Sequence, residues 1–154
     1  MKFFGISSCE NLFKKDNFVI KSLIKIIEKT IILYKKRFSN SKDLIIKKWP
    51  SKSNLNAWYV KLIQQGYQNS HIHPDGWISG VFYLKVPKFI NKQDGSIKLT
   101  IDGYDYPVNK RLPSLVHSPK DFDLILFPSS LFHRTIPFRL KETRHVIAFD
   151  LIPF

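Results

Sequence analysis

The chain has 154 residues, a length that suits one domain and allows a sizeable core without disulfide or metal staples. Its single cysteine excludes an internal disulfide and a cysteine-rich zinc module. The formal net charge is +13, and the first fifty residues carry 12 basic and 4 acidic side chains. Because most of the basic residues are lysines and arginine is the usual base reader, we interpret this charge mainly as a solvated surface. Nucleic acid stays open as a partner.

No apolar run approaches the roughly 18 residues that a membrane-spanning helix needs, so we expect no membrane insertion. The uncharged stretch between Lys2 and Cys9 is also shorter than the apolar core of about seven residues in a secretory signal. We therefore predict a cytoplasmic protein.

An amphipathic helix is predicted from Asp16, a plausible N-cap, to about Arg37. Its apolar residues recur at steps of three and four, namely Ile20, Ile24, Ile27, Ile31 and Tyr34. Lysines follow another face, which indicates a helix that packs on an apolar surface and is otherwise solvated. We expect this helix to buttress a sheet.

Beyond Pro50 the pattern changes to short runs of β-branched and aromatic residues separated by turn residues. Strands are predicted over residues 57–63, 78–86, 96–101, 123–127 and 145–151. Several strands without intervening helices indicate a mainly β protein with an antiparallel barrel or sandwich. We expect a single domain over residues 1–154, with a helical part at 1–50 and the barrel at 51–154.

The sequence His71-Ile72-His73-Pro74-Asp75 offers three metal-ligand side chains at alternate positions. If this segment is extended, residues 71, 73 and 75 leave the same face. Two imidazoles and one carboxylate suit non-heme Fe(II) and leave coordination positions open for other ligands. Such triplets are common, and taken alone they are weak evidence for a metal.

A third histidine and a late arginine strengthen the argument. His133 follows the predicted strand 123–127 and a Pro-Ser-Ser turn, which would expose it at the mouth of a barrel. Arg144 opens the last predicted strand, where it shares one face with Val146, Ala148 and Asp150. A guanidinium that faces an apolar interior needs an anionic partner, and the terminus of a dicarboxylic acid provides one.

Taken in order, these motifs resemble the prolyl-hydroxylase-like oxygenases that depend on 2-oxoglutarate and Fe(II). The resemblance is greatest to an uncharacterised bacterial and phage subgroup with H-x-H-P, then S-G-V-x-Y-L, then F-P-S and a downstream histidine. It extends over roughly residues 57–152, and the matching residues are His71, His73, Pro74, Ser79-Gly80-Val81-Phe82-Tyr83-Leu84, Phe127-Pro128-Ser129, His133 and Arg144.

The resemblance implies a double-stranded β-helix, which is a jelly-roll or cupin-like barrel, with Fe(II) at its open end. It further implies 2-oxoglutarate and O2 as co-substrates, and hydroxylation of an unidentified substrate with release of succinate and CO2. His133 would bind the metal. Arg144, Tyr83 and Ser79 would bind 2-oxoglutarate.

Two registers of the first motif stay open. Gly66-Tyr67 stand at the family's spacing before His71, which would make His71 the first ligand and place His73 where the family usually has aspartate. The other register uses His73 and Asp75 and restores two histidines and one carboxylate. We favour His71 as the first ligand.

Residues next to the ligand motifs complete the predicted site. Trp77 and Arg134 are expected at the mouth, where they would meet a substrate that is a protein side chain, a small molecule or a nucleic acid. The family commonly has glycine before the aspartate that leads to the distal histidine, whereas this chain has Phe122-Asp123. We expect that difference to affect a turn and not the chemistry.

Two alternative functions share some of these features. A metal-binding cupin that does not use 2-oxoglutarate partly matches both histidine motifs, but no glutamate stands between Pro74 and Leu84 and Arg144 would have no role. A basic nucleic-acid-binding module predicts salt-sensitive binding without metal. That reading leaves the ordered histidines and arginine unexplained.

Overall fold

The computed structural model describes residues 5–87, 93–103 and 111–154, and the statements below concern these residues. A short strand, a 3-10 turn and two helices come first: β1 Gly5–Ser7, η1 Leu12–Lys14, α1 Phe18–Arg37 and α2 Leu44–Lys47. The rest is β structure: β2 Ser53–Leu62, β3 Ile78–Lys85, β4 Ile97–Thr100, β5 Ser114–His117, β6 Leu124–Pro128, β7 Phe132–Thr135 and β8 Arg144–Pro153. The prediction of a mainly β chain with an N-terminal helix is confirmed. None of the described helices is long and apolar enough to cross a membrane.

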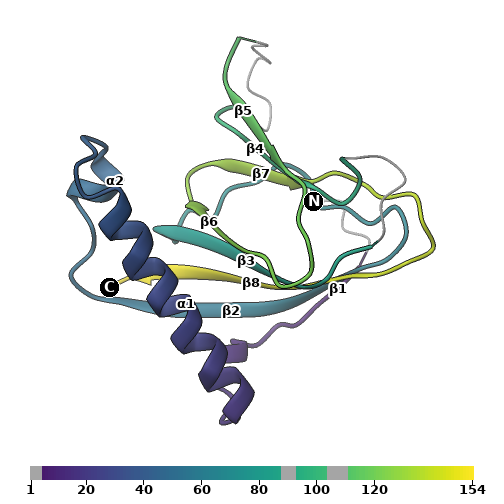
Figure 1. Ribbon diagram of the computed structural model, residues 1–154, viewed down its shortest axis with the longest axis horizontal. Helices are drawn as coiled ribbons and strands as arrows, with labels where there is room; N and C mark the ends of the chain where they lie inside the picture. Colours follow the sequence, from purple (N-terminus) through teal and green to yellow (C-terminus); the bar gives the residue numbers. More distant parts are fainter. Residues whose placement is uncertain (1–4, 88–92, 104–110) are drawn as a thin grey trace.

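Two antiparallel sheets form the barrel. The larger has the strand order β1-β2-β8-β3-β6, and the smaller has the order β5-β4-β7. Figure 1 shows the smaller sheet lying opposite the larger one. The central strand β8 pairs with β2 from Ser53↔Pro153 to Leu62↔Arg144 and, on its other side, with β3.

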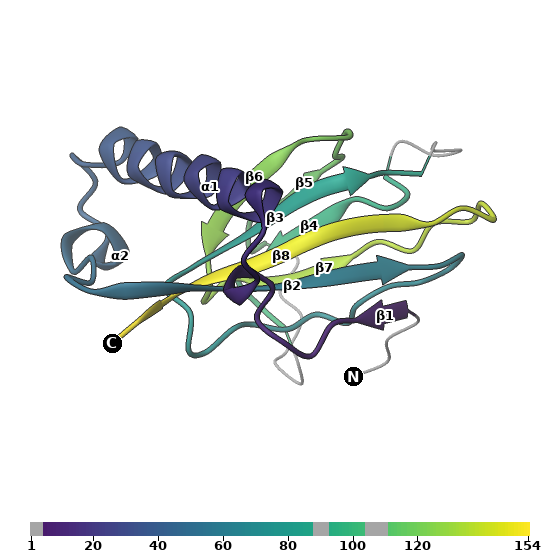
Figure 2. The same cartoon turned by 90° about the horizontal axis from the view of Figure 1, so that it is seen from below.

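Strand alternation gives the large sheet two different faces, and each has its own core. On the outer face, Leu23, Ile27 and Ile31 of α1 are buried in one cluster with residues of β2, β3 and β8, namely Ala57, Ile78, Ile147, Phe149 and Leu151. Figure 2 shows α1 lying along this face. The inner face belongs to a second cluster, which contains Val60, Leu62, Val81, Tyr83, Ile97, Phe127, Phe138 and Val146. The buttressing role predicted for the helix is confirmed.

Some boundaries differ from the predictions. Helix α1 is capped by Asn17, whose side chain accepts hydrogen bonds from the amides of Val19 and Ile20, whereas Asp16 forms an ion pair with Lys21. Strands β1, β5 and β7, each three or four residues long, were not predicted. His133 therefore lies on a strand that follows the expected turn.

The turn before β6 is preserved without its glycine. Phe122 adopts a φ of 68°, a left-handed conformation that side chains other than glycine rarely take. Its amide donates to the carbonyl of Tyr83 at 2.7 Å, and the Tyr83 amide donates to the carbonyl of Asp123 at 2.9 Å. These two bonds hold the turn against β3 at the expense of local strain.

Candidate metal centre and cofactor cavity

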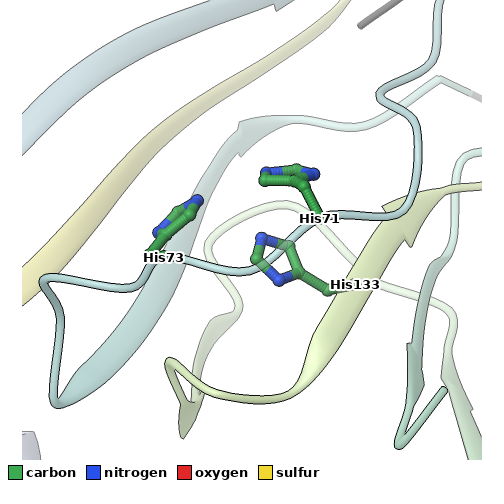
Figure 3. A group of neighbouring side chains, drawn as sticks. All are labelled: His71, His73 and His133. Atoms are coloured by element: carbon green, nitrogen blue, oxygen red, sulfur yellow. The ribbon is translucent and has the colours of Figure 1, made fainter. Parts of the chain in front are cut away.

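Three imidazoles converge at one end of the barrel. His71 and His73 lie on the segment that precedes β3, and His133 lies on β7 (Figure 3). Each of the three offers one nitrogen, and these nitrogens all lie within 4.8 Å of one another. The ring centroids are 4.2 Å apart for His71 and His133, 4.8 Å for His73 and His133, and 5.2 Å for His71 and His73.

Backbone hydrogen bonds bring the three residues together. The His71 amide donates to the His133 carbonyl at 3.1 Å, and the His133 amide donates to the His71 carbonyl at 2.9 Å, which forms an isolated bridge between the two segments. The His73 amide donates to the Ser129 carbonyl at 3.1 Å. The histidine segment is thus fixed to β7 and to the turn that precedes it.

Each of the three rings has its Nδ1 beside a hydrogen-bond acceptor. The acceptors are the carbonyl of Asn69 for His71 at 2.7 Å, the carbonyl of Leu131 for His133 at 3.2 Å, and Asp150 Oδ1 for His73 at 2.7 Å. A neutral imidazole carries one proton, so a proton on Nδ1 leaves the lone pair of Nε2 free. Three such lone pairs form a donor set that fits a divalent transition metal.

Burial keeps two of these rings neutral. Burial is the main cause and the neighbouring His71 and His73 add to it, and together they lower the pKa of His133 to about 3. The pKa of His71 is also lowered, chiefly by burial, although the Asn69 carbonyl opposes the change. Metal ions bind neutral imidazole, so the environment favours the protonation state that a ligand requires.

Asp75 and Trp77 lie elsewhere. Asp75 is exposed in a turn and is outside the group of three imidazoles, because the chain reverses at Pro74 and the Gly76 amide donates back to the His73 carbonyl at 3.1 Å. Trp77 packs beside the outer core, where its Nε1 donates to the Ile45 carbonyl at 2.9 Å, and it does not line the cavity. The expectation that Trp77 stands at the mouth does not fit this position.

A cavity of about 30 Å³ joins the imidazoles to Arg144. Arg144 is 2% exposed, and its guanidinium carbon lies 4.9 Å from the ring centroid of Tyr83. Among the described residues, neither Arg144 Nε nor the Tyr83 hydroxyl has a hydrogen-bond partner, and no carboxylate forms an ion pair with the guanidinium. Burial raises the pKa of Tyr83, so its hydroxyl stays protonated and can donate. A buried cation without a counter-ion fits the carboxylate end of a ligand.

The remaining lining residues divide between wall and rim. Ser79, predicted to bind the cofactor, lines the cavity, but its hydroxyl donates to Asp150 Oδ1 at 2.6 Å and lies 2.8 Å from Ser129 Oγ. Arg134 is exposed and has the opposite strand parity to His133, yet it borders the cavity at the rim, together with Trp58 and Gln68.

Sequence reasoning did not assign a role to Asp150 or to Trp58, whose ring centroid lies 5.4 Å from that of His73. The alternation that placed Asp150 on the face of Arg144 was a usable signal. It did not tell which residue Asp150 would meet.

Comparison with known proteins agrees with this geometry. A family model described as "Putative 2OG-Fe(II) oxygenase" matches residues 56–150. A prolyl-4-hydroxylase from Pseudomonas putida superposes with a TM-score of 0.66 at 9% identity, over 98% of this chain and 74% of that one. An oxidoreductase of the 2OG-Fe(II) oxygenase family from Burkholderia pseudomallei gives a TM-score of 0.50 at 13% identity, over 66% of this chain and 44% of that one. No curated protein matches the sequence. The structural likeness confirms the predicted jelly-roll fold.

Proposed function

Since the chain belongs to the 2OG-Fe(II) oxygenase family, we propose that it is a hydroxylase whose iron is bound by His71, His73 and His133. Fe(II) is the cofactor of this enzyme class, and 2-oxoglutarate and O2 are its co-substrates. The observation that carries the proposal is the convergence on a single cavity of three imidazole nitrogens and one buried guanidinium that forms no ion pair with the described residues. This ligand set corresponds to the register that begins at His71.

Bound Fe(II) would supply the oxidising chemistry with O2 as the oxidant: one oxygen atom would enter the succinate formed from 2-oxoglutarate with release of CO2, and the other would enter the hydroxylated substrate. The protein contributes position, charge and a cavity shielded from water. The shielding comes from apolar side chains that line the cavity beside the imidazoles, namely Val81, Ile97, Phe127, Val146 and Ala148. Substrate would reach the site past Trp58, Gln68 and Arg134.

Arg144 is the residue that we assign to the far carboxylate of 2-oxoglutarate. Its guanidinium presents N–H donors in a plane that matches a carboxylate in two parallel hydrogen bonds. The Tyr83 hydroxyl is a second donor beside it. The Ser79 hydroxyl already lies within hydrogen-bond distance of Asp150 Oδ1, Ser129 Oγ and His73 Nδ1, so we assign Ser79 to the support of the metal site and not to direct cofactor binding.

The test is an anaerobic titration with Fe(II) and then 2-oxoglutarate, followed by the visible charge-transfer band of the chelate. We expect wild-type protein to develop the band, His133→Ala to lose it, and Arg144→Ala to require a much higher concentration of 2-oxoglutarate. His117→Ala and Arg139→Ala are matched controls, since His117, at the end of β5, pairs with Asp123 and Arg139 is exposed. Both should behave as wild type.

Three results would contradict the proposal in different ways. Metal binding without a band on addition of 2-oxoglutarate would favour a cupin that does not use this co-substrate. The absence of metal binding would remove the basis for any oxygenase activity. A band that survives in His133→Ala would show that the iron is bound elsewhere.

A further inference from the structure

We infer that Asp150 is a positioning residue for His73 and supplies, from outside the ligand set, the negative charge that three imidazoles lack. This inference rests on the proposed function in one respect, which is that His73 binds the metal. It assigns to Asp150 a role in metal affinity and in the electronic character of the bound iron.

Hydrogen bonds place Asp150 behind His73. Asp150 is 7% exposed, and its Oδ1 accepts from His73 Nδ1 at 2.7 Å and from the Ser79 hydroxyl at 2.6 Å. Ser79 lies opposite Asp150 in the register of β3 and β8, and its Oγ is 2.8 Å from the fully buried Ser129 Oγ. Because the His73 amide also binds the Ser129 carbonyl, ring and backbone are tied to the same support.

The space around this network is closed. A Cβ added to Gly76 would lie 2.6 Å from Ser129 Oγ and 3.4 Å from Asp150 Cγ, so the histidine segment passes directly over the two side chains. Trp58 covers His73 from another side, with ring centroids 5.4 Å apart. His73 therefore has little freedom to turn away from Asp150.

The partner of His73 differs in kind from the partners of the other two rings. The Nδ1 atoms of His71 and His133 face backbone carbonyls, whereas that of His73 faces a carboxylate. A carboxylate partner fixes the tautomer of a ligating histidine and makes it a stronger electron donor than a carbonyl partner does. In the register that begins at His71, His73 also stands where the oxygenases that the sequence resembles usually have an aspartate ligand.

The experiment compares Asp150→Asn with Asp123→Asn, which removes the carboxylate from another histidine pair, that of His117 and Asp123. Asparagine retains an oxygen that accepts the His73 proton but has no charge. In Co(II) titrations followed by visible absorption, we expect Asp150→Asn to bind about 10- to 100-fold more weakly than wild type. Asp123→Asn should bind as wild type, and His133→Ala should not bind.

The wavelength of the charge-transfer band distinguishes an electrostatic role of Asp150 from a purely structural one. With Fe(II) and 2-oxoglutarate bound, loss of the negative charge should make the iron a poorer donor and move the charge-transfer band of Asp150→Asn to shorter wavelength. A merely structural role would weaken the band without moving it. Ser79→Ala keeps the carboxylate, so its band should stay at the wild-type position.

The outcomes are distinguishable. Wild-type affinity and an unshifted band in Asp150→Asn would overturn the inference while leaving the oxygenase proposal intact. Complete loss of binding, as in His133→Ala, would also overturn it, because a positioning residue tunes metal affinity and is not indispensable for it. If wild type itself binds no metal, the proposed function fails first. Should Asp150→Asn not fold, the ¹⁵N NMR spectrum of metal-free wild type decides, since a proton on Nε2 of His73 instead of Nδ1 would contradict the geometry.

Discussion

Replacement of Arg144 with methionine should make the ligand-free protein more stable and abolish its response to 2-oxoglutarate. Arg144 is 2% exposed, its Nε has no hydrogen-bond partner, and the described residues provide no carboxylate to pair with it. Methionine has a similar length, is flexible enough to fill the space and carries no charge. The substitution removes a buried cation whose partner, in our proposal, is the co-substrate.

Two opposing contributions determine how much Arg144→Met should raise the free energy of unfolding of the ligand-free protein. An unsatisfied buried donor costs about 1–3 kcal/mol. The Tyr83 ring, 4.9 Å from the guanidinium carbon, returns about 0.5–2 kcal/mol through a cation–π contact. The net gain of Arg144→Met is then roughly 1 kcal/mol, which for a domain of this size corresponds to about 2–4 °C in melting temperature. 2-Oxoglutarate at a hundred times its Kd should raise the free energy of unfolding of wild type by about 2.7 kcal/mol. Wild type would then be more stable than Arg144→Met.

These stabilities can be measured by urea denaturation and thermal unfolding. Wild type and Arg144→Met are compared in the presence of Mn(II), with and without 2-oxoglutarate. Arg139→Met is the matched control, because Arg139 is exposed and its loss should change neither stability nor the response to ligand. The reasoning is refuted if ligand-free Arg144→Met is less stable than wild type. It is equally refuted if 2-oxoglutarate still stabilises the variant.

Three further substitutions test the packing that supports the site, each by urea denaturation. Ile27→Ala should lower the free energy of unfolding by about 2–5 kcal/mol, because Ile27 is fully buried between α1 and the sheet; a loss below that range would mean that the helix is not a buttress. Gly80→Ala should lower the free energy of unfolding by about 1–3 kcal/mol, because the added Cβ would lie 2.2 Å from Phe149 Cζ. A variant as stable as wild type would show that the Phe149 ring moves aside without cost. Phe122→Gly should raise the free energy of unfolding by about 0.5–1 kcal/mol by relieving the φ of 68°, whereas Phe122→Ala, which keeps the strain, should not.

Regular alternation made much of the fold predictable from the sequence. The step of three and four residues in α1 identified its buried face, and Ile27 and Ile31 are indeed in the outer core. The period of two on the last strand placed Arg144 and Val146 on one face, and both are buried there. His133 was predicted from its order in the chain, since a distant histidine after an apolar strand is brought back to the first motif by the barrel.

The alternation of side chains did not predict the site correctly where the chain is not part of a continuous β-ladder. Residues 71, 73 and 75 would share a face only in a continuous strand, but His71 forms an isolated bridge and a turn follows Pro74. Asp75 and Trp77 consequently leave the cavity. Asp150 was missed for another reason. Its contact with His73 depends on which residue of β3 stands opposite it, and a single sequence does not reveal that long-range register.

The register of β3 against β8 determines both ends of the proposed site. Ser79 stands opposite Asp150 beside the imidazoles, and Tyr83 stands opposite Val146 next to Arg144. Four residues of strand separate the two ends, about 13 Å. A slip of one residue would turn all the side chains of one strand to the opposite face, so the metal end and the carboxylate end cannot be altered independently. The Gly80–Phe149 pair lies between them in the same ladder. A change there that disturbs the register should impair metal binding and 2-oxoglutarate binding together.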